Sequence, residues 1–70
     1  MTFIEIMKEA TPQQRGKVMA AIIADGVSAS AAYAYCNGSR RPKYLYRVQI
    51  QKHVKKFLGW EVPLDELFPE

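Results

Sequence analysis

The sequence predicts a small all-α domain of four to five helices, and three observations support this fold class. Seventy residues, 49% of them apolar, suffice for one domain with a thin core but not for two. Gly and Pro number only four each, which argues against a disordered or collagen-like chain. The clear local patterns are helical, with capping residues before apolar stripes and glycines after them. We expect helices at about residues 2–10, 12–24, 28–36 and 43–58, and a short turn at 64–68.

The first two helices are defined by their stripes and by a strong start signal. Thr11-Pro12-Gln13-Gln14 is a capping box, in which the Thr11 hydroxyl accepts an orphan amide and Gln14 reaches back to the Thr11 amide. Pro12 suits the first helical position, where its missing N–H costs nothing. The stripe of the first helix is Phe3, Ile4, Met7 and Ala10, and that of the second is Val18, Met19, Ile22 and Ile23. Asp25-Gly26 ends the second helix.

The last three elements are bounded in the same way. Ser28 is a suitable N-cap for a helix that Asn37-Gly38 closes, and Gly59 ends the long helix after Pro42. The apolar stripe of that long helix is Tyr46, Ile50, Val54, Phe57 and Leu58, whereas Lys52, Lys55 and Lys56 lie opposite and are expected to be solvated. We expect four apolar residues of the tail to close the core: Trp60, Leu64, Leu67 and Phe68.

The charges are unevenly distributed, although the net charge is only +3. Residues 40–56 contain no acid and these bases: Arg40, Arg41, Lys43, Arg47, Lys52, Lys55 and Lys56. Residues 57–70 contain no base and these acids: Glu61, Asp65, Glu66 and Glu70. A basic segment indicates an anionic partner such as nucleic acid, but a solvated helix face neutralised by the acidic tail explains it equally well.

The sequence contains few of the residue types that form catalytic and metal sites. Cys36 is the one cysteine, so no internal disulfide forms, which favours a reducing cytoplasm. His53 is the one histidine and has no Ser, Cys or Asp partner at motif spacing. We therefore expect no enzyme, no metal site and no cofactor. Neither a signal peptide nor a run of eighteen apolar residues is present, so we expect no membrane span.

Residues 12–37 combine two predicted helices with a short glycine-containing connection, the pattern of a helix-turn-helix. Gly26 permits the sharp turn, Val27 is suited to plug the space between the helices, and Ser28 caps the second one. Ala32, Tyr35 and Cys36 can face the core, which turns the other side of this helix outward.

At these residues the chain resembles a known group of proteins. Gly26-Val27-Ser28 followed by Asn37 resembles the turn and recognition helix of the lac-repressor type. The continuation Asn37-Gly38-Ser39-Arg40-Arg41-Pro42, with Asp65-Glu66-Leu67-Phe68-Pro69 near the end, is similar to the small lambda-repressor-like regulators of phages and mobile elements. The resemblance covers residues 12–69 and implies a DNA-binding regulator in a bacterial or phage-infected cell, associated with the nucleoid.

The resemblance also implies a role for individual positions. Ala29, Ser30, Tyr33 and Ala34 match the positions that face base edges, and Ser28, Asn37, Ser39, Arg40, Arg41 and Lys43 match those that contact the DNA backbone. The second set suits phosphates, because Arg and Lys neutralise them and Ser and Asn donate hydrogen bonds to them. The first set differs from the residues that usually recognise bases, since it lacks the Arg, Lys, Asn and Gln that make bidentate contacts to them.

Two functions therefore remain open for the outward face of the third helix. It reads DNA weakly or through DNA shape, or it packs against another protein as an adaptor or antirepressor. Tyr33 and Tyr44 either stack on nucleic acid or are ordinary surface tyrosines, whereas Tyr35 and Tyr46 are expected in the core. A DNA-binding domain this small requires a dimer for useful affinity, and we expect a homodimer formed through Trp60 and the C-terminal tail. No small-molecule substrate is indicated.

Overall fold

The computed structural model describes residues 1–69, and these residues form five helices without a strand. The helices are α1 (Phe3–Glu9), α2 (Pro12–Ala24), α3 (Ala29–Asn37), α4 (Tyr44–Leu58) and α5 (Leu64–Leu67). The predicted all-α fold is thus confirmed, and helix ends differ from the expected ones by one residue at most. Three helices start one residue late because Thr2, Ser28 and Lys43 are N-caps whose backbone is extended.

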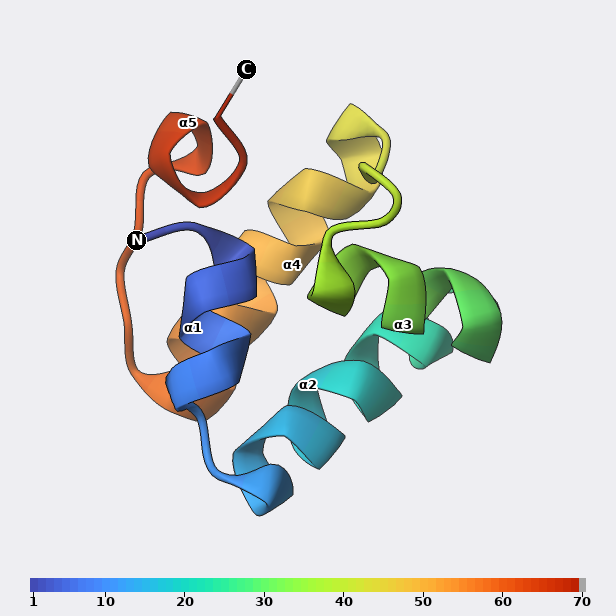
Figure 1. The fold of residues 1–70 in the computed structure, drawn as a ribbon, viewed down its shortest axis with the longest axis horizontal. Coiled ribbons are helices and arrows are strands. Elements are labelled where there is room, and N and C mark those ends of the chain that lie inside the picture. Colours follow the sequence, from blue (N-terminus) through green and yellow to red (C-terminus); the bar gives the residue numbers. More distant parts are fainter. Residues whose placement is uncertain (70) are drawn as a thin grey trace.

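The five helices enclose one core (Figure 1). The longest, α4, passes behind α1 and packs along α2, while α3 returns from the far end of α2 toward α1. The short α5 lies beside the N-terminus and contacts α4. Every helix contributes to the core, whose most buried members are Phe3, Ile6, Val18, Ile22, Ala32, Ile50, Val54 and Leu67. None of the helices in residues 1–69 has both the length and the apolar character that crossing a membrane requires.

The predicted start of α2 is confirmed in atomic detail. The Gln14 amide donates to the Thr11 hydroxyl at 3.1 Å, and the Thr11 amide donates to the Gln14 side chain at 3.0 Å. Between α1 and α2, the Arg15 guanidinium donates to the Ala10 carbonyl at 2.7 Å and to the Met7 carbonyl at 3.3 Å. Arg15 therefore satisfies carbonyls at the end of α1 that have no helical partner.

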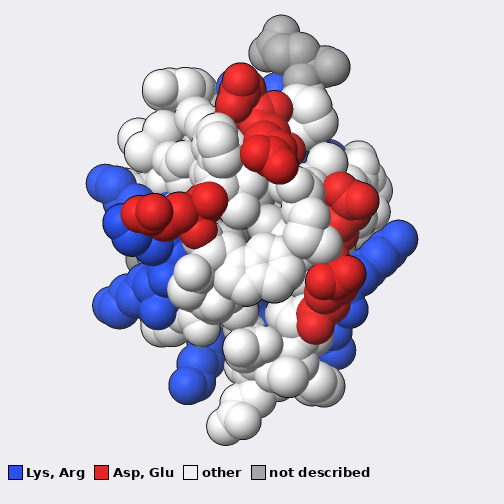
Figure 2. Space-filling view, turned by 90° about the vertical axis from the view of Figure 1, so that its left-hand side faces the viewer, with Lys and Arg blue, Asp and Glu red and all other residues white. Residues whose placement is uncertain are grey.

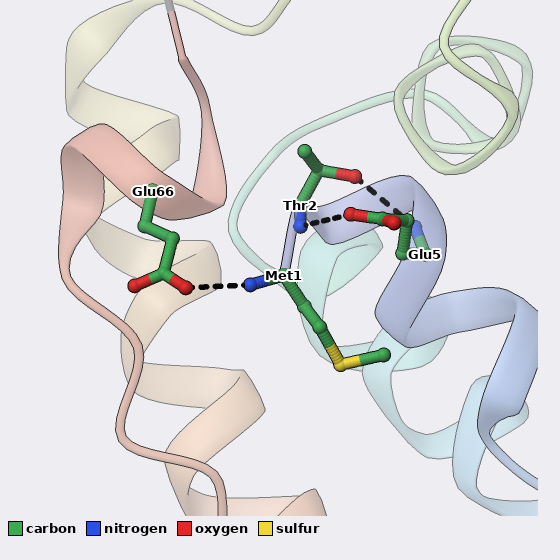
Figure 3. Close-up of polar contacts among 4 residues, drawn as sticks. All are labelled: Met1, Thr2, Glu5 and Glu66. Atoms are coloured by element: carbon green, nitrogen blue, oxygen red, sulfur yellow. Dashed lines mark hydrogen bonds and ion pairs between the residues drawn. The ribbon is translucent and has the colours of Figure 1, made fainter.

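The start of α1 is a second capping box that also anchors the C-terminal segment (Figure 3). The Thr2 amide donates to Glu5 Oε1 at 2.8 Å, and the Glu5 amide donates to Thr2 Oγ1 at 3.3 Å. The first of these hydrogen bonds lowers the pKa of the Glu5 carboxyl. The N-terminal ammonium of Met1 lies 2.7 Å from Glu66 Oε1, so the residue before this capping box is linked to α5.

Three expectations about the core are wrong. Ile23 is 41% exposed, because it lies at the edge of the α2 stripe and only Val18 and Ile22 point directly at α4 and α3. Trp60 is 36% exposed and does not close the core, since Gly59 turns the chain before it. Leu64 is only half-buried and lies outside the core, so Leu67 and Phe68 close it, together with Val62.

Candidate nucleic-acid interface

The turn between α2 and α3 has the geometry of a helix-turn-helix. Gly26 adopts a φ of +101°, a left-handed value that a side chain would strain, and its amide donates to the Ile23 carbonyl at 3.0 Å. Val27 is buried between the two helices, as expected. Ser28 caps α3 by accepting a hydrogen bond from the Ala31 amide at 3.1 Å. The turn thereby sets the direction in which α3 leaves α2.

One side of α3 is inside the protein and the other faces solvent. Ala31, Ala32 and Tyr35 are buried, whereas Cys36 is half-buried at the margin of the core. The expected outward set follows from this packing, because successive helical residues are rotated by about 100°. Ala29 and Ser30 are exposed, Tyr33 is 68% exposed, and Ala34 is half-buried.

The outward side of α3 carries little polar chemistry. The helix contains no charged residue. Asn37 has the amide that could bind adenine, but its Oδ1 already accepts a hydrogen bond from the Ser39 amide at 2.9 Å. That bond leaves its NH₂ group and the Ser30 and Tyr33 hydroxyls as hydrogen-bonding groups on this surface.

The loop 38–43 follows α3 and is largely exposed. Ser39, Arg40, Arg41 and Lys43 are exposed, and the Arg40 amide donates to the Ala34 carbonyl at 3.3 Å. Pro42 is buried. The Arg41 guanidinium donates to the Pro69 carbonyl at 2.6 Å and to the Phe68 carbonyl at 3.1 Å, so it lies against the C-terminal segment. Sequence reasoning placed Arg41 among the phosphate contacts, and nothing local in the sequence indicated this long-range contact.

Basic residues continue from this loop along the start of α4. The Arg47 guanidinium carbon lies 5.6 Å from the centre of the Tyr44 ring, a cation–π distance. Tyr44 and Leu45 are both highly exposed. Further along α4, Lys52, Lys55 and Lys56 are exposed as predicted. Lys55 pairs with Glu61 at 2.6 Å, and this bond lowers the pKa of Glu61 and raises that of Lys55.

Acidic residues gather on a different side of the molecule. Figure 2 shows the side formed by α1, α5 and the segment that joins α4 to α5, with carboxylates spread across it and basic residues toward its margins. These elements carry Glu5, Glu9, Glu61, Asp65 and Glu66. Figure 1 places α3 at the far side of the molecule from them. The exposed bases Arg40 and Lys43 are therefore separated from most of the acids.

His53 has a partner that its sequence spacing did not reveal. Its Nε2 atom lies 2.7 Å from Asp25 Oδ2, across 28 positions of the chain, and both side chains are partly buried. The pair lies outside any motif spacing, because the packing of α4 on α2 creates it. Since Asp25 ends α2, the pair fastens the helix-turn-helix to α4.

The remaining reactive group of the sequence, the Cys36 thiol, lies in an ordinary packing environment. The Cys36 thiol contacts Met19 Sδ at 3.2 Å, and burial raises the pKa of the thiol to about 11. Within residues 1–69, no three His, Cys, Asp or Glu side chains come together in a way that could hold a metal ion.

Comparisons with protein-family models, with curated proteins and with solved structures found no match to this chain.

Proposed function

We propose that this chain binds double-stranded DNA as a small transcriptional regulator of the lambda-repressor-like helix-turn-helix class, with α3 in the major groove. The observation that carries the proposal is the combination of the short, glycine-containing α2–α3 turn with an outward side of α3 that no other described element covers. A helix fits the major groove of B-DNA in this arrangement, with its N-terminal residues toward the bases.

The phosphate contacts are proposed at both ends of α3. Ser28 lies at the N-terminal end, and its hydroxyl hydrogen is still available because the oxygen acts only as an acceptor in the cap. At the C-terminal end lie the Asn37 amide group and three exposed residues of the loop, Ser39, Arg40 and Lys43. Since the acids lie on the side shown in Figure 2, docking through α3 keeps most carboxylates away from DNA.

Base recognition is proposed through Ala29, Ser30, Tyr33 and Ala34. The alanine methyl groups can contact thymine methyl groups, and Ser30 can bond to several bases, so direct discrimination is weak. Sequence-dependent shape and deformability of the DNA then supply part of the specificity.

We propose that two copies bind together. A single domain offers few phosphate contacts, so a homodimer presenting two half-sites about 34–36 Å apart gives the needed affinity. Trp60 is the exposed aromatic residue that best fits this contact, because it borders a hollow of about 490 Å³ with Lys52 and Val62. An occupied site then blocks or recruits polymerase.

Fluorescence anisotropy with a labelled random-sequence duplex at about 50 and 200 mM salt tests the proposal. Phosphate binding releases counterions, so affinity is expected to fall steeply with salt. Arg40→Ala is expected to reduce the slope of log affinity against log salt by about 0.9, the value for one lost phosphate contact. Lys56→Ala removes the same charge from an exposed position of α4 that lies neither in the loop 38–43 nor in the hollow beside Trp60, and it is the matched control.

The alternative function is a protein-interaction module, and the exposed Tyr33, Tyr44 and Leu45 favour it. If the folded protein binds no duplex at either salt concentration, this alternative replaces DNA binding. An adaptor of this kind keeps its protein partner when Arg40 and Arg41 are replaced by Ala.

A further inference from the structure

Arg41 differs from the other basic residues of the loop 38–43 in what it binds. Its two terminal nitrogens donate to two successive carbonyls, Pro69 O at 2.6 Å and Phe68 O at 3.1 Å. A guanidinium is a planar fork, so two simultaneous bonds hold both its position and its orientation. A lysine ammonium at the same position would be a single point donor without that fork.

The segment that Arg41 binds is itself fastened to the core. Leu67 is 1% exposed, and its amide donates to the Pro63 carbonyl at 2.9 Å. The Phe68 ring lies 5.6 Å from the ring of Phe3, and the Phe68 amide donates to the Leu64 carbonyl at 2.9 Å. These contacts give Arg41 a fixed anchor.

The other end of the contact is the loop that carries the proposed phosphate ligands. Arg40 immediately precedes Arg41, and Lys43 follows the buried Pro42. Arg41 is bonded to the C-terminal segment and Pro42 is buried, whereas Arg40 and Lys43 are exposed on either side of them. The orientation of these two charges therefore depends on how firmly the loop is held.

We propose that Arg41 is a positioning residue of the DNA interface, which fastens the loop 38–43 to residues 68–69 and thereby orients Arg40 and Lys43 toward the phosphates. This inference rests on the proposed function and adds to it that the C-terminal segment, which lies outside the helix-turn-helix, controls the DNA affinity. Arg41 acts through its neighbours.

A comparison of Arg41→Lys with Arg41→Ala separates this role from direct phosphate binding. Lysine keeps the charge but cannot bind both carbonyls as a fork, so both variants are expected to lose affinity for the random duplex equally, by about three- to tenfold. Lys56→Arg, which keeps a charge at an exposed position of α4 outside the proposed interface, is expected to stay within about twofold of the unchanged protein. Phe68→Ala changes no charge and is expected to weaken binding as well. If Arg41→Lys binds like the unchanged protein, or if Arg41→Ala does, the proposal is overturned.

A second measurement, made without DNA, keeps this result separate from the proposed function. The Arg40 amide bonds to the Ala34 carbonyl, and its hydrogen exchange can be followed by NMR. Exchange is expected to be faster in Arg41→Lys and Arg41→Ala and unchanged in Lys56→Arg. Equal exchange in all variants would refute the proposal that Arg41 fastens the loop 38–43 to residues 68–69. If the unchanged protein binds no duplex, the proposed function fails, and the DNA role of Arg41 fails with it.

Discussion

The end of α3 lies so close to α1 that replacing Gly38 by alanine is expected to cost more than a backbone effect. Gly38 has a φ of +83°, and a Cβ atom built there would lie 2.6 Å from Ile4 Cδ1 and 3.4 Å from Ile4 Cγ1. Alanine in the left-handed region costs about 1 kcal/mol. Moving the half-buried Ile4 side chain off its rotamer adds about 1 kcal/mol. Gly38→Ala is therefore expected to lower the free energy of unfolding by about 2 kcal/mol.

Gly59 provides the matched control for this prediction. It has a φ of +75°, but nothing lies within 4 Å of a Cβ built there, so Gly59→Ala is expected to cost only the backbone part, about 1 kcal/mol. Thermal denaturation followed by circular dichroism resolves the difference, which corresponds to about 4–8 °C in Tm for a domain of this size. In an Ile4→Ala background, Gly38→Ala and Gly59→Ala should cost the same. Equal costs with Ile4 still present would refute the close packing of α1 on the α3 C-cap.

The remaining predictions concern one buried residue, one polar pair and the thiol. Leu67→Ala should lower the free energy of unfolding, measured by urea denaturation, by about 2–4 kcal/mol, because Leu67 is fully buried. A loss below about 1 kcal/mol would mean that α5 adds little to the core. His53→Ala should lower the free energy of unfolding by about 1–2 kcal/mol, because it removes the bond to Asp25. The control Lys52→Ala should leave the urea midpoint unchanged. Equal midpoints for the two variants would contradict a stabilising contact between His53 and Asp25. Cys36 should react with iodoacetamide at pH 8 about 100-fold more slowly in the folded than in the urea-unfolded protein, since its pKa of about 11 leaves little thiolate; similar rates would show an accessible thiol. Above about pH 9 the unfolded thiol ionises first, so Cys36 should also make the fold less stable as pH rises toward 11.

The fold class and the helix ends could be predicted because both depend on local chemistry. Thr11 with Gln14 starts α2, Ser28 starts α3, and Gly38 ends it, each through groups within a few residues. Thr2 with Glu5 has the same spacing, so the start of α1 also carries a readable signal. Local hydrogen bonds of this kind form wherever the helix forms, whatever packs against it.

The outward side of α3 could be predicted for a related reason. Once Ala32 and Tyr35 are assigned to the core, helical geometry turns Ala29, Ser30 and Tyr33 outward, and their exposure agrees with this. The DNA contacts assigned to these residues remain a prediction. A residue at the edge of an apolar helix stripe is harder to assign. Whether it is buried depends on how much of the helix the neighbouring helices cover, and Ile23 of α2 is such a residue.

The contacts that join distant segments could not be read from spacing. The pair His53–Asp25 spans 28 positions, and Arg41 reaches the carbonyls of Phe68 and Pro69 across 27 and 28 positions. Each depends on the path of the chain between its partners. Backbone carbonyls, moreover, are present at every residue, so no residue type near the end of the chain marks them as the partners of Arg41.

These long-range contacts hold both ends of α3 in a short chain. A domain of about this size buries only about 60% of the surface that its unfolded chain exposes, so a loop outside the core has little to fix it. Here the turn before α3 is fastened to α4 through His53, and the loop after α3 is fastened to the C-terminal segment through Arg41. Both ends of α3 are thus held by side chains from outside the helix. If α3 docks in a groove as proposed, a variant that breaks one of these two polar contacts is expected to weaken binding while every proposed DNA contact is still present.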